Sequence, residues 1–103
     1  MKNMNDLLRQ AQIMQQKVQK VEEEAASRTF EASSGGGMVV ALVTGKMEVR
    51  KLTIDPKIVA EGDAEMLQDL IIAAVNEALR IAKDTVRREM EAISNGIRLP
   101  GMG

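Results

Sequence analysis

The chain has 103 residues, of which 45% are apolar and 28% charged, and its formal net charge at pH 7 is −1. It contains neither cysteine nor histidine, which excludes disulfides, thiolate metal sites and cysteine nucleophiles and removes the commonest general base and metal ligand. The length suits one domain whose small core would gain from a partner subunit, and the near-neutral charge argues against a strongly basic, histone-like nucleic-acid binder.

The amino terminus predicts no secretory signal, because MKNMNDLLRQ mixes polar and apolar residues and has no continuous apolar stretch. No apolar run approaches the roughly 18 residues that a membrane-spanning helix needs. We therefore expect a soluble, cytoplasmic protein without a membrane partner.

A first helix is predicted over about residues 4–26, with Asn3 or Asn5 as its cap. Apolar residues recur there at alternating spacings of three and four, which is the a/d seam of a heptad pattern. The seam consists of Met4, Leu7, Ala11, Met14, Val18, Val21 and Ala25. So narrow a seam predicts that another helix packs against it, and Leu8 and Ile13 suggest a second, weaker contact face.

After this helix the apolar period changes to two, which predicts strands over about residues 28–33, 38–44 and 47–54. The middle strand, MVVALV, is apolar on both faces, so we expect cover on both sides. Thr44-Gly45-Lys46 predicts a tight hairpin in which Gly45 supplies a positive φ. Val49 and Leu52 are both expected to point inward, although strict alternation would place them on opposite faces of the strand. This predicts a bulge near Arg50-Lys51. The strands would form a three-stranded antiparallel meander.

Asp55-Pro56 ends the third strand, and a short loop is predicted from there through Gly62. A long helix follows over about residues 63–94, with Asp63 as N-cap and Asn95-Gly96 as its stop. The tail over residues 96–103 is predicted to be flexible. The whole chain, residues 1–103, is thus predicted to be a single α+β domain with the order helix, three strands, helix.

Three consecutive glycines in SSGGGMVV raise the possibility of a phosphate-binding loop. Such a loop joins a strand to the N-terminus of a helix, where free amide groups meet the anion. Here the glycines lead into a strand, and no Gly-Lys-Ser/Thr ending follows. The pattern favours a strand entry in which glycine supplies positive φ or close backbone approach.

Carboxylates cluster in two places without forming a recognisable site. Glu22, Glu23 and Glu24 close the first helix and are typical of a solvated face. Around the start of the last helix, capping and solvation explain a second group, and its spacing matches no calcium loop. This group is Asp55, Glu61, Asp63, Glu65 and Asp69. We predict no metal site and no cofactor.

Basic residues are the remaining candidates for a binding site. Residues 1–20 carry four cations against one carboxylate, and residues 76–103 carry five cations against four carboxylates. Arg80, Lys83 and Arg87 lie at i, i+3 and i+7, which places them on one face of the helix. Composition alone favours a helix with solvent-exposed ion pairs, and a binding surface is the competing hypothesis.

Taken in order, the heptad helix, GGGMVVALVTGKMEVRKLTIDP, DAEMLQDLIIAAVNEAL and the terminal PGMG resemble the YbaB/EbfC family of bacterial nucleoid-associated proteins. The resemblance covers nearly the whole chain. It implies a tweezer-like homodimer whose helices project as arms. It also implies binding to duplex DNA, a nucleoid location, and effects on nucleoid organisation and gene expression.

The projecting helices are the part of the family implicated in DNA contact. The resemblance therefore assigns DNA binding to Lys2, Arg9, Lys17, Lys20, Arg80, Lys83, Arg87 and Arg88. No base-reading motif is present, so phosphate contacts and a steep salt dependence are expected. A non-enzymatic dimeric adaptor that holds another protein through its helical arms is the alternative. An enzyme with a small-molecule substrate is not predicted, since no catalytic constellation is recognisable.

Overall fold

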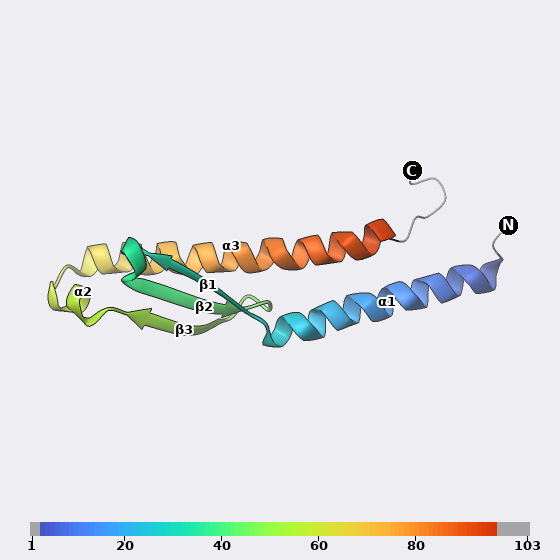
Figure 1. Cartoon of the computed structure of the whole chain (residues 1–103), viewed down its shortest axis with the longest axis horizontal. Helices are drawn as coiled ribbons and strands as arrows, with labels where there is room; N and C mark the ends of the chain where they lie inside the picture. The colour runs from blue at the N-terminus through green and yellow to red at the C-terminus, as the bar shows by residue number, and fades with distance from the viewer. Residues whose placement is uncertain (1–2, 97–103) are drawn as a thin grey trace.

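The computed structural model describes residues 3–96, and it confirms the predicted order of elements in an α+β fold (Figure 1). Helix α1 spans Met4–Ser27, strands β1, β2 and β3 span Thr29–Ser34, Val39–Thr44 and Val49–Ile54, and helix α3 spans Ala64–Gly96. A 3-10 turn, η1, spans Gly35–Gly37, and helix α2 spans Pro56–Ala60. The candidate Lys2 and residues 97–103 of the expected flexible tail lie outside the described residues.

Helix α2 corrects the expectation of a plain loop after the third strand. Pro56 occupies the first helical position, where its missing N–H is not needed. The Asp55 carboxylate accepts a hydrogen bond from the backbone N–H of Lys57 at 3.0 Å and so caps the helix. Ile58 is only 1% exposed. The Asp-Pro pair that ends the strand therefore also starts a helix, which buries one large apolar side chain.

Strand β2 lies at the centre of the sheet, with antiparallel neighbours on both sides. Its register with β3 shifts because Leu42 pairs with Lys51 whereas the next residue, Val43, pairs with Val49. Arg50 is therefore the extra residue of a β-bulge, which confirms the predicted irregularity at this place.

Helix α3 lies along one face of the sheet, over β1 and β2 (Figure 1). The β2 side chains that face the helix are Val39, Ala41 and Val43, and all three are fully buried. The helix meets them with Ala74, Ala78 and Ala82, which recur every four residues and are also fully buried. Small alanine side chains allow a helix to approach a sheet closely, and here they form the helix side of the core.

Within one chain, β2 is covered on one face only, so a single protomer does not supply the expected cover on both sides. Val40 and Leu42, on the face away from α3, are only half-buried. Helix α3 covers β3 much less than it covers β1 and β2, and Val49 and Leu52 of β3 are 50% and 37% exposed. On α3 itself, Ile72 is 57% exposed. A single protomer thus leaves apolar surface uncovered on both the sheet and the long helix.

Gly45 is required for a reason that differs from the predicted one. The positive φ in the β2–β3 turn belongs to Met47, at 65°, and Gly45 is not among the positive-φ residues of the described chain. Instead, the Gly45 N–H donates to the carbonyl oxygen of Ala25 at 2.9 Å. A Cβ at position 45 would lie 2.5 Å from that oxygen. Glycine therefore allows the turn to lie directly against the end of α1.

The three glycines of η1 confirm the expectation of positive φ, with values of 59°, 66° and 94° at Gly35, Gly36 and Gly37. They turn the chain from β1 into β2, and Ser34 fixes the turn by donating from its hydroxyl to the carbonyl oxygen of Leu70 at 2.6 Å. A strand rather than a helix N-terminus follows the turn. The geometry of a phosphate-binding loop is therefore absent from this part of the described chain.

The N-cap of α3 gives a first testable prediction. The Asp63 carboxylate accepts a hydrogen bond from the backbone N–H of Met66 at 3.0 Å, as the sequence predicts. The Asp63→Ala substitution removes this hydrogen bond and is expected to lower the free energy of unfolding by about 1 kcal/mol, measured by urea denaturation. Asp69→Ala, which removes an exposed carboxylate from the second turn of the same helix, is the matched control. Equal losses in the two variants would contradict the capping role.

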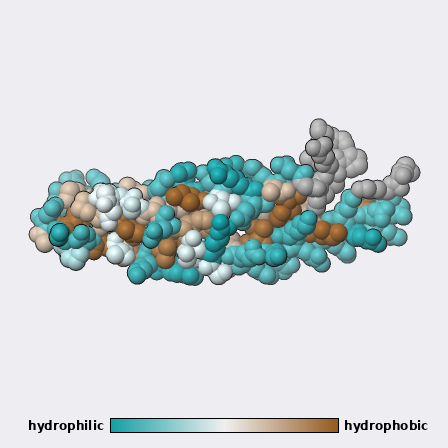
Figure 2. All heavy atoms as spheres, in the orientation of Figure 1, coloured by the Kyte–Doolittle hydropathy of each residue, from teal (hydrophilic) through white to brown (hydrophobic). Residues whose placement is uncertain are grey.

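Helix α1 extends away from the sheet as an arm, which makes the molecule 70 Å long but only 25 Å by 16 Å across (Figure 1). The C-terminal part of the arm lies antiparallel beside the end of α3, and the N-terminal part continues beyond it. Exposure along the heptad seam rises accordingly, from 5% at Ala25 to 38% at Leu7 and 69% at Met4. Figure 2 shows apolar atoms gathered between the two helices. Helix α3 therefore covers only the C-terminal part of the predicted seam and leaves its N-terminal part exposed.

Candidate nucleic-acid interface

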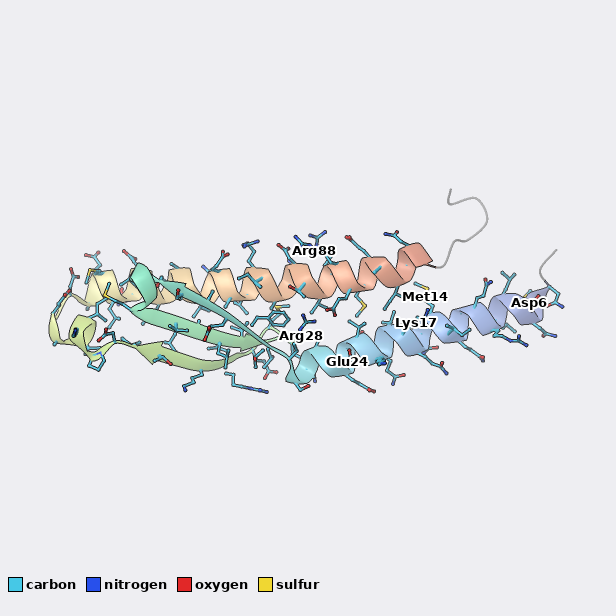
Figure 3. All side chains as sticks on the ribbon, viewed as in Figure 1. Asp6, Met14, Lys17, Glu24, Arg28 and Arg88 are labelled. Carbon is cyan, nitrogen blue, oxygen red and sulfur yellow. The ribbon has the colours of Figure 1, made fainter. Side chains whose placement is uncertain are left out.

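Three of the predicted DNA-binding residues lie on the arm. Arg9, Lys17 and Lys20 are exposed, and none of them forms an ion pair within residues 3–96. Their side chains are therefore available to an external anion without the loss of a carboxylate partner. Figure 3 shows Lys17 on the arm, and it shows Arg88 on the side of α3 away from the arm.

Two of the predicted residues on α3 are held by carboxylates of the same helix. Arg80 pairs with Glu77 at 2.5 Å and with Asp84 at 3.0 Å. Arg87 pairs with Asp84 at 3.6 Å and with Glu91 at 3.1 Å. Each partner lies three or four residues away, so the five side chains form one ladder along the exposed face. With two cations and three carboxylates, this ladder has no surplus of positive charge for a phosphate.

The contact between Arg80 and Glu77 shifts the pKa of both groups. The hydrogen bond from Arg80 is the main reason why the pKa of the Glu77 carboxyl lies below its ordinary value, and the same contact raises the pKa of Arg80. The small stabilisation from this exposed pair is present above the ordinary pKa of a glutamate. It is lost as the pH falls through the lowered pKa of Glu77, when protonation releases Arg80.

The other two predicted cations on α3 are not part of the ladder. Lys83 and Arg88 are exposed, and neither pairs with a carboxylate in the described part of the chain. The cations predicted from sequence therefore fall into two groups. The ladder contains Arg80 and Arg87, and the unpaired group consists of Arg9, Lys17, Lys20, Lys83 and Arg88.

Sequence reasoning missed a second group of exposed cations, on the β2–β3 turn, β3 and α2. These residues are Lys46, Arg50, Lys51 and Lys57, and no ion pair joins them to other described residues. A signal was present, because residues 46–57 hold four cations against two carboxylates. Helical spacing could not reveal it, since most of the segment is not helical. Arg50 and Lys51 lie on the edge strand β3, where charged side chains disfavour pairing with strands of other chains.

Arg28, at the junction of α1 and β1, was also missed as a candidate. Its guanidinium forms an ion pair with Glu89 of α3, and it lies over the ring of Phe30 at 5.1 Å from the centroid. Arg28 therefore connects the end of the arm with both the sheet and the long helix.

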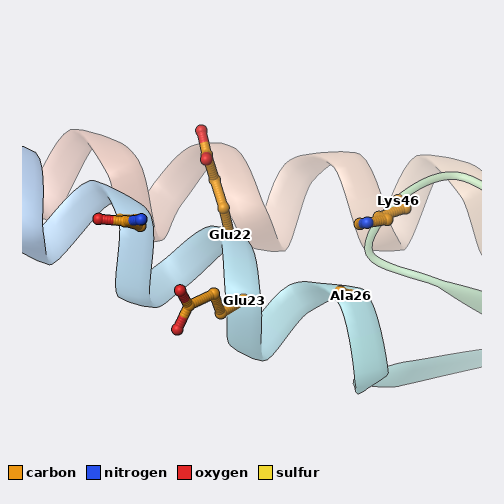
Figure 4. A pocket seen from close by; sticks show the side chains of 5 residues that line it. Glu22, Glu23, Ala26 and Lys46 are labelled. Atoms are coloured by element: carbon orange, nitrogen blue, oxygen red, sulfur yellow. The ribbon is translucent and has the colours of Figure 1, made fainter.

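A surface hollow of about 390 Å³ lies between the arm and the β2–β3 turn (Figure 4). Its lining consists of Gln19, Glu22, Glu23, Ala26 and Lys46. Two carboxylates against one ammonium make it unfavourable for a phosphate. No group of three or more possible metal ligands occurs in the described range. Over the same residues, no helix combines the length and the apolar character that crossing a membrane requires.

A model of the YbaB/EbfC DNA-binding family matches residues 1–97 of the chain. The chain belongs to this family. A relative from Moorella thermoacetica, called a nucleoid-associated protein, is 50% identical over 98% of this chain and 97% of its own length. Another from Acetivibrio thermocellus, also called a nucleoid-associated protein, is 48% identical over 97% of this chain and 89% of its own length.

The fold has a counterpart in the crystal structure of an uncharacterized protein from Helicobacter pylori, with a TM-score of 0.65 and 24% identity. The match covers 76% of this chain and 90% of that one. The YbaB/EbfC family is described by DNA binding and not by an enzymatic activity. The family resemblance inferred from the strand and helix motifs is therefore confirmed.

Proposed function

We propose that this protein binds duplex DNA as a homodimer through phosphate contacts, and that it thereby acts in the nucleoid on DNA organisation and gene expression. The observation that carries the proposal is the set of exposed, unpaired cations on two neighbouring helices of a YbaB/EbfC chain. Three of these cations, Arg9, Lys17 and Lys20, lie on the arm. The other two, Lys83 and Arg88, lie on α3.

The charge arrangement supports contacts to phosphates rather than to bases. Flexible ammonium and guanidinium groups on exposed helix faces can follow a phosphate backbone, whereas base recognition requires polar side chains that fit into a groove. Arg80 and Arg87 join the contact by exchanging a carboxylate for a phosphate. Because each exchange gives up an existing ion pair, these two arginines contribute less than the unpaired cations.

The homodimer is supported by apolar surface that one chain leaves open. Val49 and Leu52 on β3, and Ile72 on α3, are exposed although they belong to elements that form the core. A chain of this size buries only a small fraction of its surface and is therefore marginally stable. Exposed apolar side chains add no stability to the monomer, and a group of them marks a site of interaction. A second copy presents the same residues, so a two-fold axis would cover both patches at once and place two arms side by side.

Sedimentation velocity tests the dimer. The wild-type chain is expected to sediment as a dimer at micromolar concentration, and Ile72→Glu is expected to shift it toward monomer because a charge would be buried in the interface. Ala73→Glu is the matched control, since Ala73 is exposed and lies seven residues before Arg80 on the ladder face. A wild-type chain that remains monomeric would contradict the dimer.

A gel shift over a series of salt concentrations tests the DNA site. Arg87→Glu combined with Arg88→Glu is expected to reduce the affinity for duplex DNA at moderate salt, because it reverses the unpaired cation Arg88 and one cation of the ladder. The control reverses Arg50 and Lys51 on the β-bulge. Unchanged affinity in the α3 variant would contradict the assignment of the site to the helices.

A non-enzymatic adaptor that holds another protein is the second candidate. The observation in its favour is the apolar tip of the arm, where Met4 is 69% exposed and Leu8 is 55% exposed. Absence of DNA binding by the wild-type dimer, even at low salt, would favour the adaptor.

A further inference from the structure

The arm is attached to the body of the molecule through its last turn. Ala25 is the buried residue of α1, and its carbonyl oxygen accepts a hydrogen bond from the Gly45 N–H. The same N–H also reaches the carbonyl oxygen of Arg28 at 3.2 Å. The last carbonyl groups of a helix have no partner within it, so the β2–β3 turn serves as the cap of the arm.

Arg28 adds the contact between this junction and the long helix. Its guanidinium stacks over Phe30, which is 7% exposed and belongs to the core, while Nη1 donates to the Glu89 carboxylate on α3. Figure 3 shows Arg28 in the angle between α1 and α3. One side chain thus touches the sheet and α3 from the point where the arm begins.

We propose that Arg28 is a positioning residue: its ion pair with Glu89 holds the arm beside α3 and thereby sets the distance between the cations of the two helices. The inference rests on the proposed function, because those cations are the ones assigned to DNA. The heptad seam of the arm adds half-buried apolar residues, among them Val18 and Val21. The ion pair adds a link between two defined points, the Arg28 guanidinium at the base of the arm and the Glu89 carboxylate on α3.

The exposure of the pair makes this link responsive to salt. The side chains of Arg28 and Glu89 are 47% and 37% exposed. Ion pairs at such positions are weak and are screened further as ionic strength rises. The ion pair therefore restrains the arm more at low salt than at high salt, which adds a conformational contribution to the salt dependence of DNA binding.

Distances between spin labels test the positioning directly. The chain has no cysteine, so Gln12→Cys on the arm and Ser94→Cys on α3 create two unique labelling sites, both exposed. Mixing with excess unlabelled chain leaves one labelled protomer per dimer. Pulsed electron–electron resonance is expected to give one narrow distance distribution in the parent protein and a broader one, extending to longer distances, in Glu89→Gln.

The charge-exchanged variant Arg28→Glu/Glu89→Arg restores the pair with opposite polarity and is expected to restore the narrow distribution. Identical distributions in Glu89→Gln and the parent would overturn the proposal. This measurement uses no DNA, so it decides the position of the arm even if the wild-type protein fails to bind DNA and the proposed function falls.

DNA affinity provides a second test through the direction of the change. Glu89→Gln and Glu91→Gln each remove one negative charge from the same helix. Glu91→Gln removes one of the two carboxylate partners of Arg87 and is expected to tighten binding, whereas Glu89→Gln loosens the arm and is expected to weaken binding by up to about fivefold. Tighter binding in both variants would mean that Glu89 acts only as a nearby charge, and the proposal would be wrong.

Discussion

Replacing Gly45 with alanine is expected to lower the free energy of unfolding by about 2 kcal/mol. The new Cβ would lie 2.5 Å from the carbonyl oxygen of Ala25 and 2.6 Å from its Cβ. The obstructing oxygen belongs to the backbone, so no side-chain rotation relieves the clash. The turn must move away from the arm, which weakens both hydrogen bonds that the Gly45 N–H donates. Urea denaturation followed by circular dichroism measures the change.

A glycine of η1 provides the matched control. Gly36 has a positive φ of 66°, but a Cβ built there meets no atom within 4 Å. Asparagine tolerates that conformation, so Gly36→Asn is expected to be nearly neutral, whereas Gly45→Asn is expected to be at least as damaging as Gly45→Ala. A neutral effect of Gly45→Ala would contradict the account of the turn as the cap of the arm.

Neutralising the three cations of the arm is expected to reduce affinity for duplex DNA by at least about tenfold at moderate salt. The variant combines Arg9→Gln, Lys17→Gln and Lys20→Gln, all at exposed positions without an ion pair in residues 3–96. If each cation contacts one phosphate, the slope of log affinity against log salt falls by about 2.7 per protomer. Fluorescence anisotropy with a labelled duplex gives both quantities.

The control for the arm variant removes an equal charge from the other exposed basic group. It combines Lys46→Gln, Arg50→Gln and Lys51→Gln on the β2–β3 turn and β3. Its affinity is expected to change much less, since the proposed site lies on the helices. Equal losses in the two triple variants would show that total charge, rather than the arm, governs binding.

Local patterns in the sequence identify much of the fold. The change of parity between Val49 and Leu52 locates the bulge at Arg50, because inward side chains must keep to one face of a strand. Asp63 is recognisable as a cap because a short acidic side chain precedes the apolar helix. Both features depend on residues that are close in sequence.

Features that depend on distant contacts could not be predicted in the same way. The need for glycine at position 45 comes from Ala25, which is far away in sequence, and the short turn suggested a positive φ instead. The uncovered face of β3 depends on where α3 crosses the sheet. The apolar residues on both faces of β2 indicated cover on both sides, but they could not show that one chain supplies it on one side only.

In the candidate site, too, contacts between residues close in sequence were predictable and contacts between distant residues were not. The ladder around Arg80 and Arg87 was foreseeable, since carboxylates stand three or four residues from each arginine. The pair of Arg28 with Glu89 was not, because 61 residues separate them.

The central claim is that exposed helix cations bind the DNA backbone, and the salt dependence of wild-type binding tests it most directly. The measurement is the affinity of the intact protein for two duplexes of unrelated sequence, determined from low to moderate salt. Since five exposed helix cations per protomer form no ion pair within residues 3–96, we predict similar affinities for both duplexes and a log–log slope of about −4 or steeper. Affinity that is independent of salt, or no binding at the lowest salt, would contradict the account.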